Sequence, residues 1–309
     1  MTEVTAHEAG LGIGELARLA GVPVRTVRFY CDEGILESRR SAGGHRRFDP
    51  AAVDRLRLVR RLRTLGLGLP AITGVLAGRL SVGEAVAAER AAVDAELTSL
   101  AWRSASLRAI EEAGPAERAA RLELLAAVAG GRAAYDVLVA FWRRTFGSPL
   151  PDAMLSMFLS VAVPEPPAEP TPDQVVAYAE MVTLVADRSL VRRYVTRARA
   201  DRDTVRDESA LLAGVGAACE LARPLLLAGR RPAPGHALDR FVAAHAEVRG
   251  AEDTPAYRSE LLAATAVDRD PRVRRYWGLL GRVTGEPVTV GAMHGWLIDA
   301  LDRSVTDRR

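Results

Sequence analysis

Apolar residues near the N-terminus recur at helical spacing in two short segments separated by a glycine. Four of them lie three or four residues apart and predict a helix with one buried face: Ile13, Leu16, Ala17 and Ala20. Gly21 ends this helix, and Pro23 suits the first turn of a second helix, where its missing N–H is not needed. The second helix should run to about Glu33 with Val24 and Val27 inward. Its outward residues are expected to be Arg25, Thr26, Arg28, Phe29 and Tyr30.

A basic β-hairpin and two further helices are expected next. Apolar residues Ile35 and Phe48 bound a segment with a turn at 41–44, which is typical of a hairpin. Its cationic residues are Arg39, Arg40, His45, Arg46 and Arg47. Asp49-Pro50 should begin a third helix over 51–65, and a fourth short helix should follow at 69–76.

A long helix is predicted from residue 82 to residue 113, because this stretch lacks Pro and contains a single glycine, Gly83. Apolar residues recur along it mostly every seven positions, and they are Val86, Val93, Leu97, Leu100 and Leu107. Such a seam favours pairing of helices as a coiled coil. The alternative is one amphipathic helix that packs on its own domain.

The remaining residues, 115–309, are rich in Ala, Leu, Arg and Glu and predict an all-α domain. A Pro-rich segment at 164–172 is expected to be an extended linker that divides this domain into two units, and a smaller break occurs at 230–235. Residues 177–194 resemble residues 256–276 at separations of 79 to 82 positions. Duplication and chance similarity in an Arg-rich chain explain this equally well.

The composition is that of a globular protein, with 309 residues, 49% hydrophobic and 26% charged. The longest mostly apolar stretch is taken as 153–163, too short to cross a bilayer, and the N-terminus lacks the pattern of a secretory signal. The two cysteines, Cys31 and Cys219, do not form a disulfide framework. A cytoplasmic protein without membrane contact is therefore expected.

Charge is concentrated near the N-terminus. Residues 11–80 contain 13 Arg and 6 Asp or Glu, a net charge of +7, whereas the whole chain carries only +3. This distribution is typical of a module that binds a polyanion such as nucleic acid. A solvated basic face is the alternative.

These motifs in this order resemble the MerR family of transcriptional regulators. The resemblance covers about residues 11–80, through GELARLAGV, VRTVRFYCDEGIL, the GGHRRF hairpin and AAVDRLRLVRRLRTLGLGLPAI. It implies a winged helix-turn-helix DNA-binding domain at 11–80. It also implies an antiparallel coiled-coil dimerisation helix at 81–114, which pairs two subunits across a pseudo-palindromic site.

The resemblance also assigns DNA contacts to individual residues. Arg28 and Tyr30 match positions that grip the sugar-phosphate backbone, while Phe29 stands where Tyr is usual and Pro23 replaces a frequent Ser or Thr cap. The expected DNA-binding residues are Arg18, Val24, Arg25, Thr26, Arg28, Phe29, Tyr30, Arg40, His45, Arg46 and Arg47. The expected dimerisation residues are those of the seam described above.

Aromatic residues make up only 5% of the chain, so their positions are informative. Six of those in the C-terminal region form the candidate ligand-binding set: Trp142, Tyr178, Tyr194, Tyr276, Trp277 and Trp296. The alternative is that they are core residues. The region is also faintly similar to the helical drug-binding domain of TipA-type family members.

No catalytic constellation, metal site or cofactor motif is found, so no enzyme activity and no cofactor are expected. No cysteine lies between Cys31 and Cys219, and the histidines lack metal-ligand spacing. The resemblance implies a homodimeric regulator that distorts promoter DNA for RNA polymerase, and simple repression by occupancy is equally open. A small organic effector is expected because metal ligands are missing. The alternative makes the C-terminal region a protein-interaction module without a ligand pocket, and an enzyme fused to a DNA module is the third reading.

Overall fold

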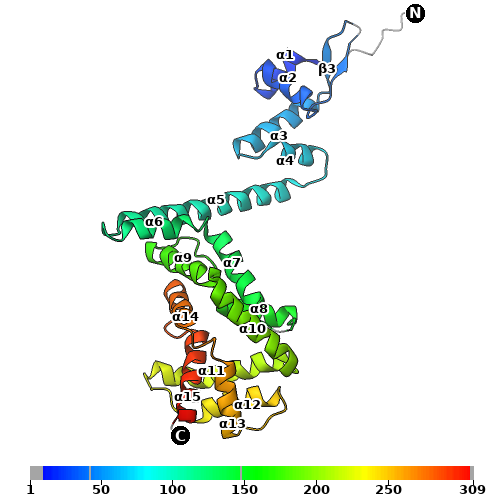
Figure 1. Cartoon of the computed structure of the whole chain (residues 1–309). Coiled ribbons are helices and arrows are strands. Elements are labelled where there is room, and N and C mark those ends of the chain that lie inside the picture. The colour runs from blue at the N-terminus through cyan, green and yellow to red at the C-terminus, as the bar shows by residue number, and fades with distance from the viewer. Residues whose placement is uncertain (1–9, 42, 147, 307–309) are drawn as a thin grey trace, which may run out of the picture. The chain divides into compact units, whose positions relative to one another are not determined.

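The computed structural model describes residues 10–41, 43–146 and 148–306. The chain forms two compact units, Met1–Leu97 and Thr98–Arg309. The described residues form fifteen helices and one small three-stranded antiparallel sheet (Figure 1), which confirms the mainly-α fold class. The N-terminus, where no signal is expected, and Ala42 in the expected hairpin turn lie outside the described residues.

The N-terminal unit follows the predicted order of short helices around a small sheet. Its elements are β1 (Leu11–Gly12), α1 (Ile13–Ala20), α2 (Val24–Asp32), β2 (Arg39–Arg40), β3 (Arg46–Phe48), α3 (Ala52–Thr64), α4 (Leu69–Leu76) and the first part of α5 (Val82–Glu111). The strand order is β1-β3-β2, with Leu11 opposite Phe48 and Arg39 opposite Arg47. Strand β1 was not anticipated, because two residues are too short to show alternation.

One hydrophobic core holds this unit together. Leu16 of α1, Val27 of α2, Leu56 of α3 and Ile72 of α4 are fully buried there beside Phe48 of β3. Leu16 and Val27 lie at the inward positions that helical spacing in the sequence predicts, and Leu56 and Ile72 lie on the two helices expected to follow.

The C-terminal unit is helical throughout its regular structure. Besides the second part of α5, its elements are α6 (Arg118–Ala126), α7 (Gly131–Arg143), α8 (Asp152–Ala162), α9 (Pro172–Ala186), α10 (Arg188–Thr204), α11 (Glu208–Leu227), α12 (His236–Glu247), α13 (Pro255–Ala264), α14 (Pro271–Thr284) and α15 (Val290–Thr306).

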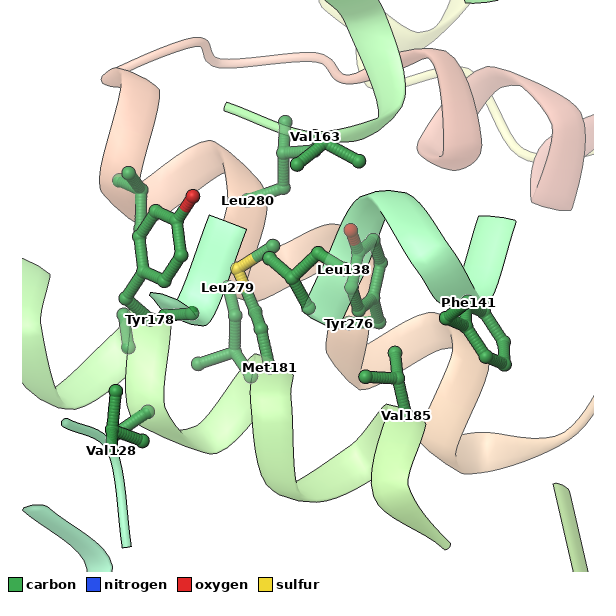
Figure 2. Packing of buried hydrophobic residues seen from close by; sticks show 14 of the residues in the cluster. Val128, Leu138, Phe141, Val163, Tyr178, Met181, Val185, Tyr276, Leu279 and Leu280 are labelled. Atoms are coloured by element: carbon green, nitrogen blue, oxygen red, sulfur yellow. The ribbon is translucent and has the colours of Figure 1, made fainter. Parts of the chain in front are cut away.

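The first hydrophobic cluster of this unit surrounds α9, which packs against α6, α7 and α14. Figure 2 shows Phe141 from α7 and Met181 and Val185 from α9 beside Leu279 from α14. Within the cluster, Tyr178 donates a hydrogen bond to the carbonyl oxygen of Pro164 at 2.6 Å. This hydrogen bond and the burial of Pro164 together anchor the start of the non-helical Pro-rich segment.

A second hydrophobic cluster is formed by α11, α12, α13 and α15. Helix α11 is apolar and long enough to cross a bilayer, which corrects the expectation that 153–163 is the longest mostly apolar stretch. The apolar stretch of α11 is longer because Glu220 and Arg223 are the only charged residues in the sequence from 209 to 227. In the structure, α11 buries Ala218, Cys219 and Ala222 in this cluster.

A partly buried polar network connects α10, α12 and the loop before α14. Arg197 forms an ion pair with Asp268 and another with Asp201, and Asp201 also pairs with Arg249 at 2.8 Å. Arg249 Nη1 lies 3.0 Å from Nδ1 of His245, whose other ring nitrogen has no hydrogen-bond partner.

Burial lowers the pKa of His245 well below its usual 6.5, and the positive charges of Arg249, His294 and Arg197 act in the same direction. Burial also lowers the pKa of His294, with Asp268 acting against it and Arg197 with it. Both imidazoles are therefore neutral in the folded protein when unfolded histidines begin to protonate.

The C-terminal unit should lose stability as the pH falls from about 7 to 5, because only the unfolded state takes up these protons. Replacing His245 with Leu should flatten this dependence by about 1.4 kcal/mol per pH unit. Urea unfolding followed by tryptophan fluorescence reports this unit alone, since all four tryptophans lie in it. The exposed His236→Leu is the matched control and should keep the full slope. Equal slopes for wild type and His245→Leu would contradict the assignment.

Candidate nucleic-acid interface

The turn between α1 and α2 is fixed by a glycine and by two arginines of α3. Gly21 has φ 67°, a left-handed conformation that favours glycine, and Val22 N–H donates to the carbonyl of Ala17 at 3.0 Å. Arg57 donates to the carbonyl oxygen of Leu19 at 3.2 Å. Arg60 donates to that of Gly21 at 3.1 Å. These guanidinium groups satisfy carbonyls that a helix C-terminus leaves unpaired.

Arg57 and Arg60 thus support the helix pair from within the domain, a role that sequence reasoning missed. The available signal was only that they lie on an arginine-rich helix. Since they reach carbonyls 38 to 39 residues earlier in the chain, local pattern alone does not reveal their partners.

Helix α2 presents cationic and aromatic side chains to solvent. The side chains of Arg25 and Arg28 are exposed and make no hydrogen bond or ion pair within 10–41, 43–146 and 148–306. Phe29 is 45% exposed, while Val24 and Thr26 are half-buried. The helix begins at Val24 with Pro23 as its extended N-cap, so Pro23 lies one position before the first turn that was expected.

The expectation that Tyr30 faces outward is wrong. Tyr30 is only 9% exposed and belongs to the hydrophobic core of the unit. The reason is helical geometry, since Tyr30 follows buried Val27 by three residues and shares its face. Its ring centroid lies 5.6 Å from that of Phe29, which remains at the surface.

Strands β2 and β3 form the antiparallel hairpin that the sequence predicts, here called the wing (residues 39–48). Its turn is closed by Gly44 N–H donating to the carbonyl of Ser41 at 2.9 Å. Arg39, Arg40 and His45 are exposed at the wing. The side chains of Arg39 and Arg40 form no hydrogen bond or ion pair with another described residue, and neither does the exposed side chain of Arg18 in α1.

Two other wing arginines are bound within the domain. Arg46 Nη2 lies 3.0 Å from Oδ1 of Asp32 at the end of α2, and this hydrogen bond raises the pKa of Arg46. Burial raises the pKa of the neighbouring Cys31 thiol, although Arg46 acts against that shift. Arg47 donates to the carbonyl oxygen of Gly10 at 3.2 Å. The Arg46–Asp32 pair thus links the wing to α2.

The expected dimerisation seam lies exposed along α5. The exposed fractions of Val86, Val93, Leu97, Leu100 and Leu107 are 37%, 45%, 59%, 51% and 59%. In the second part of the helix, Trp102, Ala105 and Ala109 are instead buried in the first cluster of the C-terminal unit. One face of α5 therefore packs on its own unit while the apolar seam faces solvent, and pairing through the seam stays a prediction.

The candidate ligand-binding aromatics are divided between the two clusters of the C-terminal unit. Trp142, Tyr178, Tyr194, Tyr276 and Trp277 lie in the first cluster. Trp296 lies in the second, where its indole donates to the carbonyl of Arg230 at 3.0 Å.

The first cluster is tightly packed around its aromatic rings. A cavity of about 10 Å³ lies beside Trp142, Tyr194 and Tyr276, room for roughly one water molecule. A ligand among these rings would have to displace packed side chains, and that part of the hypothesis stays a prediction.

The described residues contain no group of three or more His, Cys, Asp or Glu side chains that could hold a metal ion. Cys219 is buried in the second cluster of the C-terminal unit, and Cys31 is half-buried on α2. The features that stand out chemically are therefore the unpartnered arginines of α1, α2 and the wing.

Comparison with known proteins matches this part of the chain to a family. The model of the MerR HTH family regulatory proteins matches residues 11–79. The chain is 41% identical over 83 residues to the nodulation protein NolA of Bradyrhizobium sp. (strain NC92), which covers 26% of this chain and 35% of that protein. No solved structure gives a significant match.

Two further relatives agree over similar lengths. The HTH-type transcriptional activator TipA of Streptomyces coelicolor is 43% identical over 65 residues, or 21% of this chain and 26% of TipA. The mercuric resistance operon regulatory protein of Pseudomonas fluorescens is 42% identical over 67 residues, or 21% of this chain and 46% of that protein. The matches span about a quarter to a half of these relatives.

Helices α1 and α2 and the wing all lie within the matched residues 11–79. Residues 11–79 are a helix-turn-helix domain of the MerR family of regulatory proteins.

Proposed function

We propose that the chain is a cytoplasmic, non-enzymatic transcription regulator that binds double-stranded promoter DNA through α2 and the wing. The observation that carries this proposal is the set of exposed, unpartnered arginines on α1, α2 and the wing of a MerR-family domain. Guanidinium groups without a partner in the protein are available to phosphates and to guanine edges. Arg57, Arg60 and Arg47, by contrast, already bind backbone carbonyls.

The regulator acts as a homodimer on a pseudo-palindromic site. The exposed seam of α5 supports this, because a row of half-exposed Val and Leu side chains marks a protein interface. Two-fold symmetry would then place one α2 in each half-site. DNA distortion that realigns promoter elements for RNA polymerase is the output we propose, with a small organic molecule as the effector.

A second candidate for the C-terminal unit is a protein-interaction surface. Met157, Leu221 and Leu227 are 53%, 38% and 60% exposed, and the aromatic cluster leaves little room for a ligand. This candidate keeps the same DNA-binding function and changes only the signal that the C-terminal unit receives.

Selection of binding sites from random double-stranded DNA with the full chain tests the DNA-binding function. We expect a pseudo-palindrome, and Arg25→Ala should relax base preference at one position of each half-site at a cost of about 1–3 kcal/mol. Arg103→Ala on α5 is the matched control, since Arg103 is also exposed. Failure to enrich any sequence at low salt would contradict the proposal.

Variants of the Arg46–Asp32 ion pair distinguish whether Arg46 contacts phosphate or only has a structural role. If Arg46 binds phosphate, Arg46→Ala should weaken binding to all sequences and lower the salt slope by about one unit. Asp32→Ala should then preserve or strengthen binding, because it releases the guanidinium from its carboxylate partner. Equal losses from both variants with an unchanged salt slope would instead show that the pair only orients the wing.

Introducing carboxylates into the apolar seam tests whether it is a dimer interface. Leu97→Asp with Leu100→Asp should convert a dimer to a monomer, since unpaired carboxylates at a buried interface cost several kcal/mol. Light scattering of the full chain measures the mass. Leu122→Asp on α6 is the control, because Leu122 is 54% exposed but lies outside the seam. A wild-type monomer, or a dimer that both sets of variants leave intact, would contradict the seam assignment.

A further inference from the structure

Two segments of the C-terminal unit match at a constant separation of 83 residues. Between residues 149 and 187, nine residues are identical to those 83 positions later, without any gap. They are Pro149, Pro151, Leu155, Phe158, Ala168, Glu169, Thr171, Pro172 and Asp187. Eight of the nine are neither Ala nor Arg, so the abundance of those two residues does not explain the match.

The matched segments also build matched helices. Helices α9 and α13 begin at Pro172 and Pro255, and α10 and α14 begin at Arg188 and Pro271, so both pairs keep the 83-residue separation. Helix α8 begins at Asp152, and its counterpart α12 begins at His236. The similarity at separations of 79 to 82 residues differs from this register by one to four positions.

The caps of these helices are the same in chemistry and geometry. The hydroxyls of Thr171 and Thr254 each accept a hydrogen bond from the backbone N–H three residues later, at 3.2 and 3.1 Å. The carboxylates of Asp187 and Asp270 each accept one from the N–H two residues later, at 2.7 and 2.9 Å. Because capping residues define where helices begin, these identities preserve one local fold.

Carried outward, the 83-residue register pairs residues 131–213 with residues 214–296, here called the two copies. A groove of about 130 Å³ lies where they meet. Val161 and Pro164 of the first copy face Leu280 and Val290 of the second. Val290 contacts both hydrophobic clusters of the unit, so it lies at their junction. Binding pockets occur preferentially at such junctions between domains.

The charged groups of this groove favour a cation. Arg223 is already paired with both carboxylate oxygens of Glu220, at 2.8 and 2.9 Å. Glu286 also lines the groove, acts on Arg223 as a second negative neighbour, and forms no ion pair with the residues that the structure describes. Because Glu220 neutralises Arg223, Glu286 is the charged group of the groove lining that is left without an ion pair among the described residues, next to the apolar side chains of Val161, Leu280 and Val290.

We propose that the groove between the two copies binds a small organic cation with a ring-sized apolar body and one ammonium group. The volume fits this class, since an apolar protein cavity of about 150 Å³ accommodates benzene. As the effector site of a regulator the groove rests on the proposed function, but binding itself does not require DNA.

The test is titration of the full chain with benzylamine in the absence of DNA, by ligand-observed NMR. A Kd of roughly 1 mM is expected for a ligand of this size. Glu286→Gln should weaken binding about tenfold through loss of a charge-assisted contact. Val161→Phe should also weaken it, because it fills the groove from a position that is 47% exposed. Benzyl alcohol and benzoate should bind at least about tenfold more weakly.

Two control variants carry the same substitutions elsewhere. Val137→Phe starts from a side chain that is 42% exposed, and Glu252→Gln from an exposed carboxylate, and both should bind benzylamine like the wild type. Tryptophan fluorescence verifies that each variant is folded. If Val161→Phe does not fold, the result for Glu286→Gln alone decides the outcome.

No benzylamine binding, binding that neither groove variant weakens, or stronger binding of benzoate would overturn the proposal. Failure of the chain to bind DNA while it still binds benzylamine in the groove would overturn the regulatory function and leave the groove assignment intact.

Discussion

Two hydrogen bonds inside the C-terminal unit connect three segments that are far apart in the sequence. Trp142 of α7 donates to the hydroxyl of Tyr276 in α14 at 2.8 Å, and that hydroxyl donates to the carbonyl oxygen of Ala162 at 2.7 Å. Buried polar groups need such partners, so this arrangement lets the large aromatic rings lie in the interior. Burial raises the pKa of Tyr276, which keeps its hydroxyl protonated as a donor. The packing of α9 against α7 and α14 depends on this junction.

The N-terminal domain could be predicted almost completely because its signals are local. Helical spacing marked buried Leu16 and Val27, and Gly21 marked the turn that its left-handed backbone conformation requires. The outward face of the second helix was predicted less well. Tyr30 was expected at the surface, although it follows buried Val27 by three residues and therefore shares its face. Which of the arginines bind backbone carbonyls depends on tertiary contacts, and no sequence spacing encodes those.

The role of the aromatic residues in the C-terminal unit could not be predicted from the sequence. They are conspicuous because aromatic residues are rare in the chain, but composition does not distinguish a packed interior from an open pocket. Tyr194, for example, hydrogen-bonds Asp268 through its hydroxyl, and its edge contacts the ring of Phe141. The similarity near Tyr194 and Tyr276 consists largely of repeated arginines, whereas the helix caps Thr171 and Asp187 recur at the constant separation of 83 residues. Capping residues are better markers of duplication than charged surface residues, because backbone geometry constrains them.

The two thiols of the chain differ sharply in their surroundings. Cys219 is 1% exposed, and burial raises its pKa to about 12, so its sulfur stays protonated and shielded. Cys31 is half-buried on α2, beside Arg46. A maleimide dye would consequently select Cys31 in the unmutated protein. The native chain thus carries its own attachment point for an optical probe, on the very helix that we propose docks into DNA.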